Sequence, residues 1–377
     1  MKVELIQVRP DCQLVTREAG GREANLLLVF GSTAGLDNPR LYPSLKAAFP
    51  KAIVFGCSTA GEILGTRVAD DSVVAAAVRF DRVHVRAARA ALGEVGDAFQ
   101  AGVRLAKALA GNDLAHILVL SEGIQVNGTK LVAGLTSALP PGVAVTGGLS
   151  GDGTRFGRTL VMLDGPAESG IIAAVGLYGK SLRVGYASLG GWDSFGTERL
   201  ITRSNENTLF ELDGMPALDL YKSYLGDRAA ELPAAGLLFP LSVTLPGSVA
   251  PVVRTLLAID EKARSLTFAG DVPEGSFARL MKANFDRLVE GAIGAAKVSQ
   301  TSPSCGAPEL ALLISCVGRK LVLKQRVEEE VEGVRAVLGD RPSLIGFYSY
   351  GEISPFTPAA RCELHNQTMT ITTLGEA

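Results

Sequence analysis

The stretch GFYSYGEIS, residues 346–354, sets the architecture of this chain because a close copy of it occurs elsewhere. GCSTAGEI, residues 56–63, matches it at the first glycine, at a hydroxyl residue three positions later, and at the closing Gly-Glu-Ile. Each copy follows an apolar run, a helix-length connection and a proline. Such self-similarity indicates a repeated structural unit. We therefore interpret the chain as a set of units, each ending in this motif.

The same plan occurs a third time in the middle of the chain. There, an apolar run and a helix-length connection lead through two prolines to VAVTGGLSGDG, residues 143–153. The three copies span roughly residues 26–63, 115–153 and 310–354, which suits a strand–helix–strand crossover of about 30 residues or more. We expect a glycine-rich segment at the end of the second strand of each copy.

Strand and helix patterns alternate along the rest of the chain. TLVMLDG (159–165) and GIIAAVGLYG (170–179) predict a hairpin, and FARLMKANFDRLVEGAIGAAKVS (277–299) predicts a long helix. The expected fold is α/β with mixed α+β character, in two intimately joined sheet-and-helix domains built from repeated strand–helix–strand units. We place the boundary after a turn-rich stretch that ends in a short predicted helix. The two domains are residues 1–225 and 226–377.

Composition excludes several classes of protein. The formal charge is −2 and the Lys and Arg residues are scattered, whereas nucleic-acid binding needs a concentrated basic face. No stretch approaches the roughly 20 apolar residues of a membrane span, and the N-terminus lacks a secretion signal. The five cysteines are far apart, without a CxxC pair or a zinc-type cluster. We expect a cytoplasmic protein in a reducing compartment, and the Ala-, Gly-, Arg- and Leu-rich composition points to a bacterial source.

The repeated motif carries side chains that could bind a small ligand. Glycine at a strand end permits close approach of a ligand or a sharp turn. Ser349 and Glu352 in one copy, and Ser58, Thr59 and Glu62 in the other, could bind an ammonium, hydroxyl or amide group. The alternative is structural, with the glycines forming a bulge and the carboxylates accepting hydrogen bonds from turn amides. Both interpretations remain open, although ligands tend to bind beyond the carboxyl ends of such strands.

Several motifs together resemble the FIST family, with both its N-terminal and C-terminal domains. They are GCSTAGEI, GGLSGDG, ELDGMPALDLY, CVGRK, GFYSYGEISP and LHNQT, and they cover nearly the whole chain in order. The resemblance implies a bacterial sensory module that binds a small ligand and is linked to kinases, cyclases or chemoreceptors. A chain of FIST domains alone is similar to the nitric-oxide-sensing haem proteins of the family, which are encoded beside histidine kinases or cyclic-di-GMP enzymes and control their activity.

The resemblance to those haem proteins implies a non-covalent haem b, since the chain contains no CxxCH. The sequence has three histidines. His84 lies on the polar side of an alternating strand and His116 follows a turn, so both are expected at the surface. We assign His365, in LHNQT, as the haem-iron ligand, because histidine is the commonest proximal ligand in gas sensing. The alternative is a histidine that is hydrogen-bonded within the final strand.

Arg319, in CVGRK, is the remaining charged candidate. Its planar fork could bind a haem propionate or an amino-acid carboxylate, or it could pair with Glu352. The other candidates are Tyr348 and Tyr350 beside the cofactor, Asn366 beside the ligand, and Cys57 and Cys316 as lesser axial ligands.

The leading hypothesis is a FIST sensor that binds haem, detects nitric oxide and regulates a partner histidine kinase or a diguanylate cyclase/phosphodiesterase. The alternative is a haem-free FIST sensor for an amino acid or similar small metabolite, and a third interpretation is a docking scaffold. We expect no catalytic activity, because no nucleophile lies in an established motif and few histidines are available to activate one. We expect no nucleic-acid or membrane partner, and the protein could form a homo-oligomer.

Overall fold

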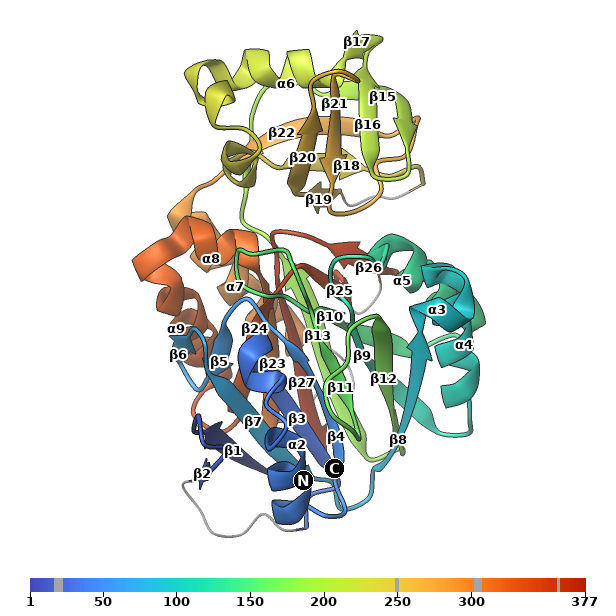
Figure 1. Ribbon diagram of the computed structural model, residues 1–377, viewed down its shortest axis with the longest axis vertical. Coiled ribbons are helices and arrows are strands. Elements are labelled where there is room, and N and C mark those ends of the chain that lie inside the picture. The colour runs from blue at the N-terminus through green and yellow to red at the C-terminus, as the bar shows by residue number, and fades with distance from the viewer. Residues whose placement is uncertain (17–22, 248–250, 302–306, 358–359) are drawn as a thin grey trace.

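The computed structural model describes residues 1–16, 23–247, 251–301, 307–357 and 360–377, so Cys305 lies outside the described ranges. Figure 1 shows a large body of packed sheets with helices on its flanks and a smaller domain above it. Both termini lie at the lower end of the body. The predicted mixed α/β class is confirmed.

Each repeated unit contributes one parallel strand pair to the body, which confirms the three predicted copies. The pairs are β3 (Leu26–Gly31) with β4 (Ile53–Ser58), β9 (Leu114–Ser121) with β10 (Ala144–Leu149), and β23 (Leu310–Cys316) with β24 (Ser343–Ser349). The crossovers contain α1 (Thr33–Leu36) and α2 (Leu41–Ala48), then α5 (Gly128–Ala138), then α8 (Val317–Leu323), η3 (Lys324–Arg326) and α9 (Val327–Leu338). An antiparallel strand flanks the first strand of each pair: β7 (Val73–Arg79), β12 (Ile171–Tyr178) and β27 (Met369–Glu376).

After its second parallel strand, each unit sends the chain into the sheet of another unit. β5 (Glu62–Leu64) follows β4 but pairs with β24, and β25 (Gly351–Pro355) follows β24 but pairs with β10. β11 (Val161–Leu163) follows β10 and pairs with β4, so the exchange is cyclic. Over the described ranges, the result is three six-stranded sheets. The other strands in them are β1 (Lys2–Val8), β2 (Leu14–Thr16), β6 (Arg67–Ala69), β8 (His84–Ala91), β13 (Leu182–Leu189) and β26 (Cys362–His365).

The three sheets share one apolar interior. Leu28 of β3, Leu120 of β9 and Ile314 of β23 belong to the same buried cluster, where the rings of Phe30 and Phe347 lie 4.7 Å apart. The outer faces are covered by helices: α2 on the first sheet, α4 (Ala98–Leu109) and α5 on the second, and α7 (Phe285–Ser299) and α9 on the third. Because both faces are buried, the central strands are continuous apolar runs such as LLLVF.

One glycine in each unit is required by a close approach of backbones. Gly56, Gly147 and Gly346 occupy equivalent positions on the second parallel strand. A Cβ at any of them would overlap a carbonyl oxygen of the neighbouring first strand. The repeated glycine is therefore explained by strand packing.

The chain between β13 and α7 forms the small domain, which has its own core around Tyr221, Leu266 and Phe268. Within the described ranges it contains nine strands: β14 (Asp193–Ser194), β15 (Arg199–Asn205), β16 (Thr208–Leu212), β17 (Met215–Pro216), β18 (Leu241–Thr244), β19 (Val252–Arg254), β20 (Leu256–Asp260), β21 (Ser265–Phe268) and β22 (Phe277–Lys282). The helices of the small domain are α6 (Ala217–Leu225), η1 (Gly226–Glu231) and η2 (Ala234–Leu238). In the body, a short helix, α3 (Leu92–Val95), precedes α4. In space, the last strand–helix–strand unit lies with the first two, and the predicted boundary at residue 225 falls inside the small domain.

Three local predictions were wrong. Residues 159–165 and 170–179 form no hairpin, because β11 pairs with β4 whereas β12 pairs with β8 and β9. Residues 277–282 form β22 rather than the first turns of a helix, and α7 begins only after the N-cap of Asn284. His116 is fully buried and bonds to the Thr146 hydroxyl (2.9 Å), because both faces of β9 are covered.

Candidate functional site

The glycine-rich exits of the three units meet at the upper end of the body and bond to one another through their backbones. The hydrogen bonds run from Ala60 N–H to the Tyr348 carbonyl (2.8 Å), from Tyr348 N–H to Gly61 (2.8 Å), from Gly151 N–H to Ser58 (2.9 Å) and from Tyr350 N–H to Leu149 (3.2 Å). Each exit therefore contacts both of the others. The first role of the repeated motif is to close the shared core of the body.

The carboxylate of the C-terminal motif is used within this closure. Glu352 is fully buried and accepts hydrogen bonds from the Ser349 hydroxyl (2.6 Å) and from the backbone N–H (3.2 Å) and hydroxyl (2.8 Å) of Thr368. Burial raises its pKa to about 8, although these hydrogen bonds oppose the shift. Glu352 thus links its strand exit to the start of β27.

Glu62 repeats this arrangement in the first unit. It accepts hydrogen bonds from the Thr59 hydroxyl and from the N–H (3.0 Å) and hydroxyl (2.7 Å) of Ser72, directly before β7. Ser58 accepts a hydrogen bond from Leu160 N–H (2.8 Å). These contacts are those of the structural interpretation, in which the motif carboxylates satisfy local donors.

Arg319 and Tyr348 are also engaged inside the protein. Arg319 is fully buried and donates to Glu330 from Nε (3.0 Å) and Nη2 (2.7 Å), and Tyr348 donates to the other oxygen of Glu330 (2.7 Å). The partner of Arg319 is therefore Glu330 and not Glu352. Arg319 also donates to the carbonyls of Gly190 (2.6 Å) and Leu288 (2.7 Å), on the segments that enter and leave the small domain. It holds the base of that domain.

His365 lies in the interior on β26. Its Nε2 donates to the Ser354 carbonyl (2.7 Å) and its ring meets Phe356 edge-on at 4.2 Å. Burial lowers its pKa to about 4, so the ring is neutral and Nδ1 carries a lone pair. Among the described residues neither Nδ1 nor the side-chain amide of Asn366 has a hydrogen-bond partner.

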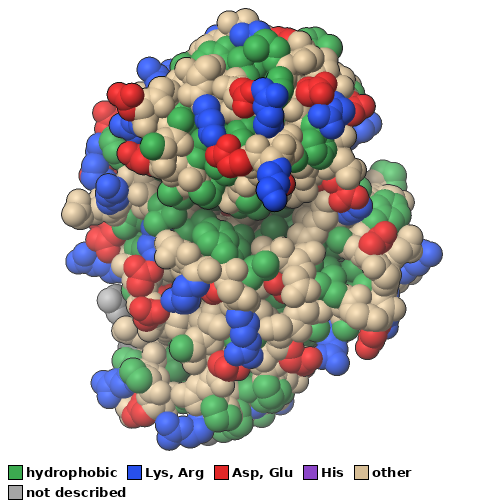
Figure 2. Space-filling view, turned by 45° about the horizontal axis from the view of Figure 1, so that its top comes forward, with side chains coloured by type: hydrophobic (Ala, Val, Ile, Leu, Met, Phe, Trp, Pro, Cys, Tyr) green, Lys and Arg blue, Asp and Glu red, His purple; other side chains and the backbone are tan. Residues whose placement is uncertain are grey.

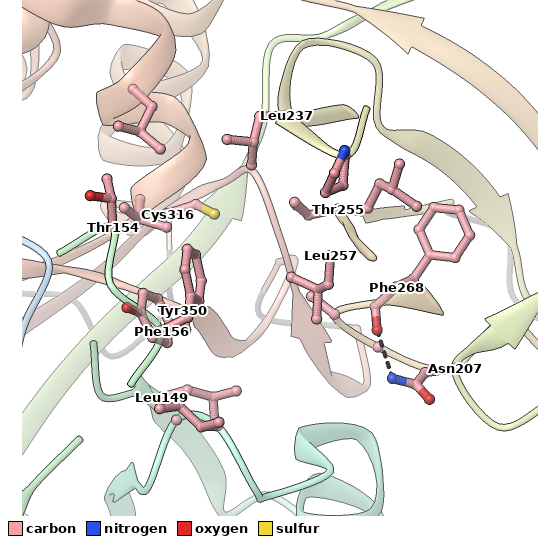
Figure 3. Close-up of a pocket in the computed structure, with 18 of the residues that line it drawn as sticks. Leu149, Thr154, Phe156, Asn207, Leu237, Thr255, Leu257, Phe268, Cys316 and Tyr350 are labelled. Atoms are coloured by element: carbon pink, nitrogen blue, oxygen red, sulfur yellow. Dashed lines mark hydrogen bonds between the residues drawn. The ribbon is translucent and has the colours of Figure 1, made fainter. Parts of the chain in front are cut away.

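The main cavity lies between the small domain and the body, with a volume of about 800 Å³. Figure 2 shows a hollow with apolar side chains below the small domain. In Figure 3, side chains of the body face side chains of the small domain across this space. The body contributes Leu149, Thr154, Phe156, Cys316 and Tyr350, and the small domain contributes Asn207, Leu237, Thr255, Leu257 and Phe268.

An aromatic pair forms the wall on the body side. The rings of Phe156 and Tyr350 stack at 4.5 Å with an interplanar angle of 17°. Asp152 fixes the loop that carries Phe156, because it accepts hydrogen bonds from the N–H groups of Phe156 (2.9 Å), Gly157 (2.8 Å) and Arg158 (2.9 Å) and from the Tyr350 hydroxyl. Tyr350, predicted beside a cofactor, therefore does line a cavity.

The cavity exposes large apolar side chains from both of its walls. Ile124 and Phe156 of the body and Leu257 of the small domain are 41%, 43% and 44% exposed and all line it. Exposed apolar side chains that gather in a concave site indicate a surface that binds something. At the edge of the cavity, Asn127 donates to Asp271 (2.9 Å) and links the two walls.

Comparison with known families agrees with this architecture. The FIST N domain matches residues 25–215, and the FIST C domain matches residues 217–355. The chain belongs to the FIST family. FIST domains are sensory domains of signalling proteins. The match to the C domain begins in the small domain and continues through the last strand–helix–strand unit of the body.

Other comparisons with this FIST protein are remote. No curated protein sequence matches it. Among solved structures, it is similar to a chorismatase, at 10% identity and a TM-score of 0.36, over 100% of this chain and 98% of the other. It is also similar to a cyanuric acid hydrolase from A. caulinodans, at 11% identity and a TM-score of 0.18, over 78% of this chain and 99% of the other. Neither likeness is close enough to support a functional argument.

The described residues around the main cavity of the FIST protein do not fit haem. No His, Lys or Arg is among its described lining residues, so a neutral imidazole ligand and a cation for the propionates are both missing. Cys316 lines the cavity, but burial raises the pKa of its thiol and disfavours the thiolate. Burial and the bond to Asp152 likewise raise the pKa of the Tyr350 hydroxyl. The nitrogen of His365 that would bind iron is not in the cavity lining.

A second cavity, of about 570 Å³, lies beside the first motif copy. It is polar, and Thr59 and Glu62 of the predicted set line it. Lys320 also lines it, donating to the Ala60 carbonyl (2.8 Å) and pairing with Asp70. Of the predicted site residues, Ser58, Ser349, Glu352, Arg319, Tyr348, His365 and Asn366 line neither cavity, and neither does Cys57.

Sequence reasoning missed most of the main cavity. Phe156 lies on a loop, Thr255 lies between β19 and β20, and Leu257 lies on β20, all outside the repeated motifs. The one signal that could have pointed to Phe156 is its place shortly after the GGLSGDG exit, beyond Thr154 and Arg155. None of the helices in the described ranges combines the length and the apolar character needed to cross a membrane.

Proposed function

We propose that this FIST protein is a haem-free sensory module whose main cavity binds a predominantly apolar organic ligand. The observation that supports this most directly is the gathering of exposed Ile124, Phe156 and Leu257 from both walls of one cavity. A volume of about 800 Å³ suits a drug-sized molecule. The protein acts as a binding module rather than an enzyme.

One wall of the cavity belongs to the body and the other to the small domain. This division suggests how ligand binding could be transmitted to a partner protein. A ligand that contacts Phe156 and Leu257 together favours one orientation of the small domain over others. Such a shift requires different affinities for the two orientations, since equal affinity would change nothing. We propose that the responding partner is a histidine kinase or a diguanylate cyclase/phosphodiesterase, on the basis of the family.

The test uses N-phenyl-1-naphthylamine, a neutral dye that fluoresces in apolar sites. We expect it to bind the intact protein at one site. Phe156→Ala and Leu257→Ala should each raise the dissociation constant about tenfold, because each removes about 1.5 kcal/mol or more of apolar contact. Phe277→Ala is the matched control, since Phe277 is 47% exposed on the small domain but lies outside the cavity.

The same preparation separates the competing proposals. Loss of affinity in only one of the two wall variants, or none, would contradict binding across the cavity. Haem-based nitric oxide sensing predicts instead that haemin forms a stable one-to-one complex with a sharp Soret band. The neutral dye would then displace haemin from the protein. That result would overturn the haem-free proposal.

An amino acid or similar polar metabolite is the second candidate, and the polar cavity beside Thr59 and Glu62 favours it. That cavity offers both Lys320 and Asp70 near the motif, which could meet a carboxylate and an ammonium group. Thermal-shift measurements across the amino acids test it. A strong stabilisation that Lys320→Gln removes would promote this candidate over the apolar ligand.

A further inference from the structure

Arg254, at the end of β19, is a buried cation without a matching anion. It is fully buried, and its Nε and Nη1 donate to the carbonyls of Asp271 (2.9 Å) and Leu364 (2.9 Å). Its Nη2 has no hydrogen-bond partner, and no carboxylate forms an ion pair with it in the part of the chain that the structure describes. Arg319, equally buried, is fully paired with Glu330.

Burial of the Arg254 guanidinium costs free energy unless an anion pairs with it. A buried charge is normally paired or shifted toward its neutral form. Burial lowers the pKa of Arg254 to about 10, so the guanidinium remains charged at neutral pH. The nearest carboxylates act only at longer range: Asp271, which accepts a hydrogen bond from Asn127, and Glu363. The site therefore lacks a bonded counter-charge.

Arg254 lies directly behind the wall of the main cavity. Gly270 lines the cavity, and a Cβ built on it would lie 2.9 Å from the guanidinium carbon of Arg254. Because Gly270 has no side chain, the guanidinium of Arg254 packs directly against the backbone of this lining residue. The next residue, Thr255, also lines the cavity, and its buried hydroxyl has no partner among the described residues.

Arg254 and Thr255 thus place two buried polar atoms without described partners beside this wall. The described lining of the cavity contains no cation, and its two carboxylates are Glu206, which pairs with Lys130, and Glu231. We propose that Arg254 and Thr255 form an anion subsite of the ligand cavity. This inference rests on the proposed function and sharpens it: the ligand is an apolar or aromatic compound with one anionic group such as a carboxylate. A small displacement of the Gly270 segment opens the path to the guanidinium.

Two dyes with the same anilinonaphthalene body test the subsite. 8-Anilino-1-naphthalenesulfonate carries an anionic group that N-phenyl-1-naphthylamine lacks. We expect the intact protein to bind the sulfonate at least tenfold more tightly than the neutral dye, and added salt to reduce that preference. Arg254→Met should bring the ratio of the two dissociation constants close to one, and Thr255→Val should reduce it severalfold.

Arg279→Met is the matched control, because Arg279 is an exposed arginine of the same domain whose one hydrogen bond within the described residues goes to the Gly196 carbonyl (3.0 Å). It should keep the wild-type ratio. Thr255→Val keeps the test decisive if Arg254→Met does not fold. Equal binding of the two dyes by the wild type, or a wild-type ratio in a folded Arg254→Met or in Thr255→Val, overturns the subsite. If the neutral dye does not bind the wild type at all, the proposed cavity itself fails.

Discussion

The buried ionisable side chains of this protein differ in whether an opposite charge and enough hydrogen-bond partners lie beside them. Arg319 and Glu330 satisfy each other, so their burial indicates a structural role at the base of the small domain. Glu352 accepts bonds from two hydroxyl residues, and no cation of the described ranges is bonded to it. Within the part of the chain that the structure describes, Arg254 has neither a bonded anion nor a full set of acceptors. Of these four side chains, only Arg254 keeps a buried donor without a described partner.

Glu352 provides a prediction about stability and pH. Its pKa is about 8 in the folded protein and 4.5 ordinarily, so between these values the folded protein retains a proton that the unfolded chain has released. Raising the pH through this window therefore lowers the free energy of unfolding. Glu352→Gln has no such proton, so its free energy of unfolding should fall less than that of the wild type as the pH rises. The difference should grow by about 1.4 kcal/mol per pH unit, to on the order of a few kcal/mol across the window.

Urea unfolding at several pH values between 5 and 8 measures the effect. His116 and His365, with pKa values lowered to about 3 and about 4, act in the opposite direction below pH 6.5, but they are present in both proteins and cancel in the comparison. Glu332→Gln, at an exposed position on α9, should follow the wild type. Parallel curves for Glu352→Gln and the wild type would show that Glu352 does not hold the proton.

At the scale of elements, the strand pairs with their glycines explain the repeat more fully than the carboxylates do. Gly346 should be intolerant of any side chain, because its Cβ would overlap the Leu313 carbonyl on the neighbouring strand. We expect Gly346→Ala to reduce the free energy of unfolding by about 3 kcal/mol. Gly93→Ala is the control, since nothing lies within 4 Å of a Cβ there, and it should change stability by less than about 1 kcal/mol. Chemical denaturation compares the two, and similar losses would contradict the packing argument.

The loop that Asp152 organises is the element most directly tied to binding. Although burial raises the pKa of Asp152, hydrogen bonds from Tyr350 and the backbone lower it overall, so the carboxylate is ionised and holds the loop. Asp152→Asn loses acceptor capacity, at a cost of about 1–3 kcal/mol, and should free Phe156 from its stacked position. We expect about five- to tenfold weaker binding of N-phenyl-1-naphthylamine.

The control for that loop is Asp213→Asn in the small domain. Asp213 also accepts a backbone hydrogen bond, from Leu200 (2.9 Å), but it lies outside both cavities. Fluorescence titration of the two variants should show the loss only in Asp152→Asn. An unchanged affinity there would mean that the aromatic wall is held by packing alone.

How far the sequence predicts this structure depends on the range of the interactions. The three units could be predicted because their strands, helices and glycines are local and repeated. The exchange of β5, β11 and β25 could not, since each pairs with a unit far away in the chain. Residues 277–282 were mistaken for helix because Phe277, Leu280 and Met281 also suit a helical spacing, and pairing with β18 decides the matter.

The candidate site was predicted least well, for a related reason. Its Tyr350 comes from a repeated motif, whereas Phe156 and Leu257 line the same cavity only because the small domain lies over the body. Polar residues of the motif attracted attention because their chemistry suits ligands. In the structure, Glu62 and Glu352 bond to neighbouring hydroxyls and amides instead.

For the whole molecule, the cyclic exchange of strands has a consequence for cooperativity. No unit can leave the body without breaking its own sheet and the sheet of one other unit, because each unit gives a strand to one neighbour and receives a strand from the other. The small domain, by contrast, has its own core and is joined to the body near Gly190 and Leu288, where Arg319 holds both segments. The body should therefore open as one unit, and the small domain should be able to open separately.

Native-state hydrogen exchange with increasing urea tests this division. The amides of Val29, Val119 and Leu313, at equivalent positions of the three units, should exchange with the same opening free energy, equal to that of global unfolding. Amides in β16 and β21 of the small domain should exchange through a smaller opening. N-phenyl-1-naphthylamine should raise the small-domain value toward the global one, because a ligand that touches both walls must be released before they separate. If Leu313 opened at a lower free energy than Val29 and Val119, the last unit would unfold independently. The cyclic exchange of strands would then not govern the stability of the body.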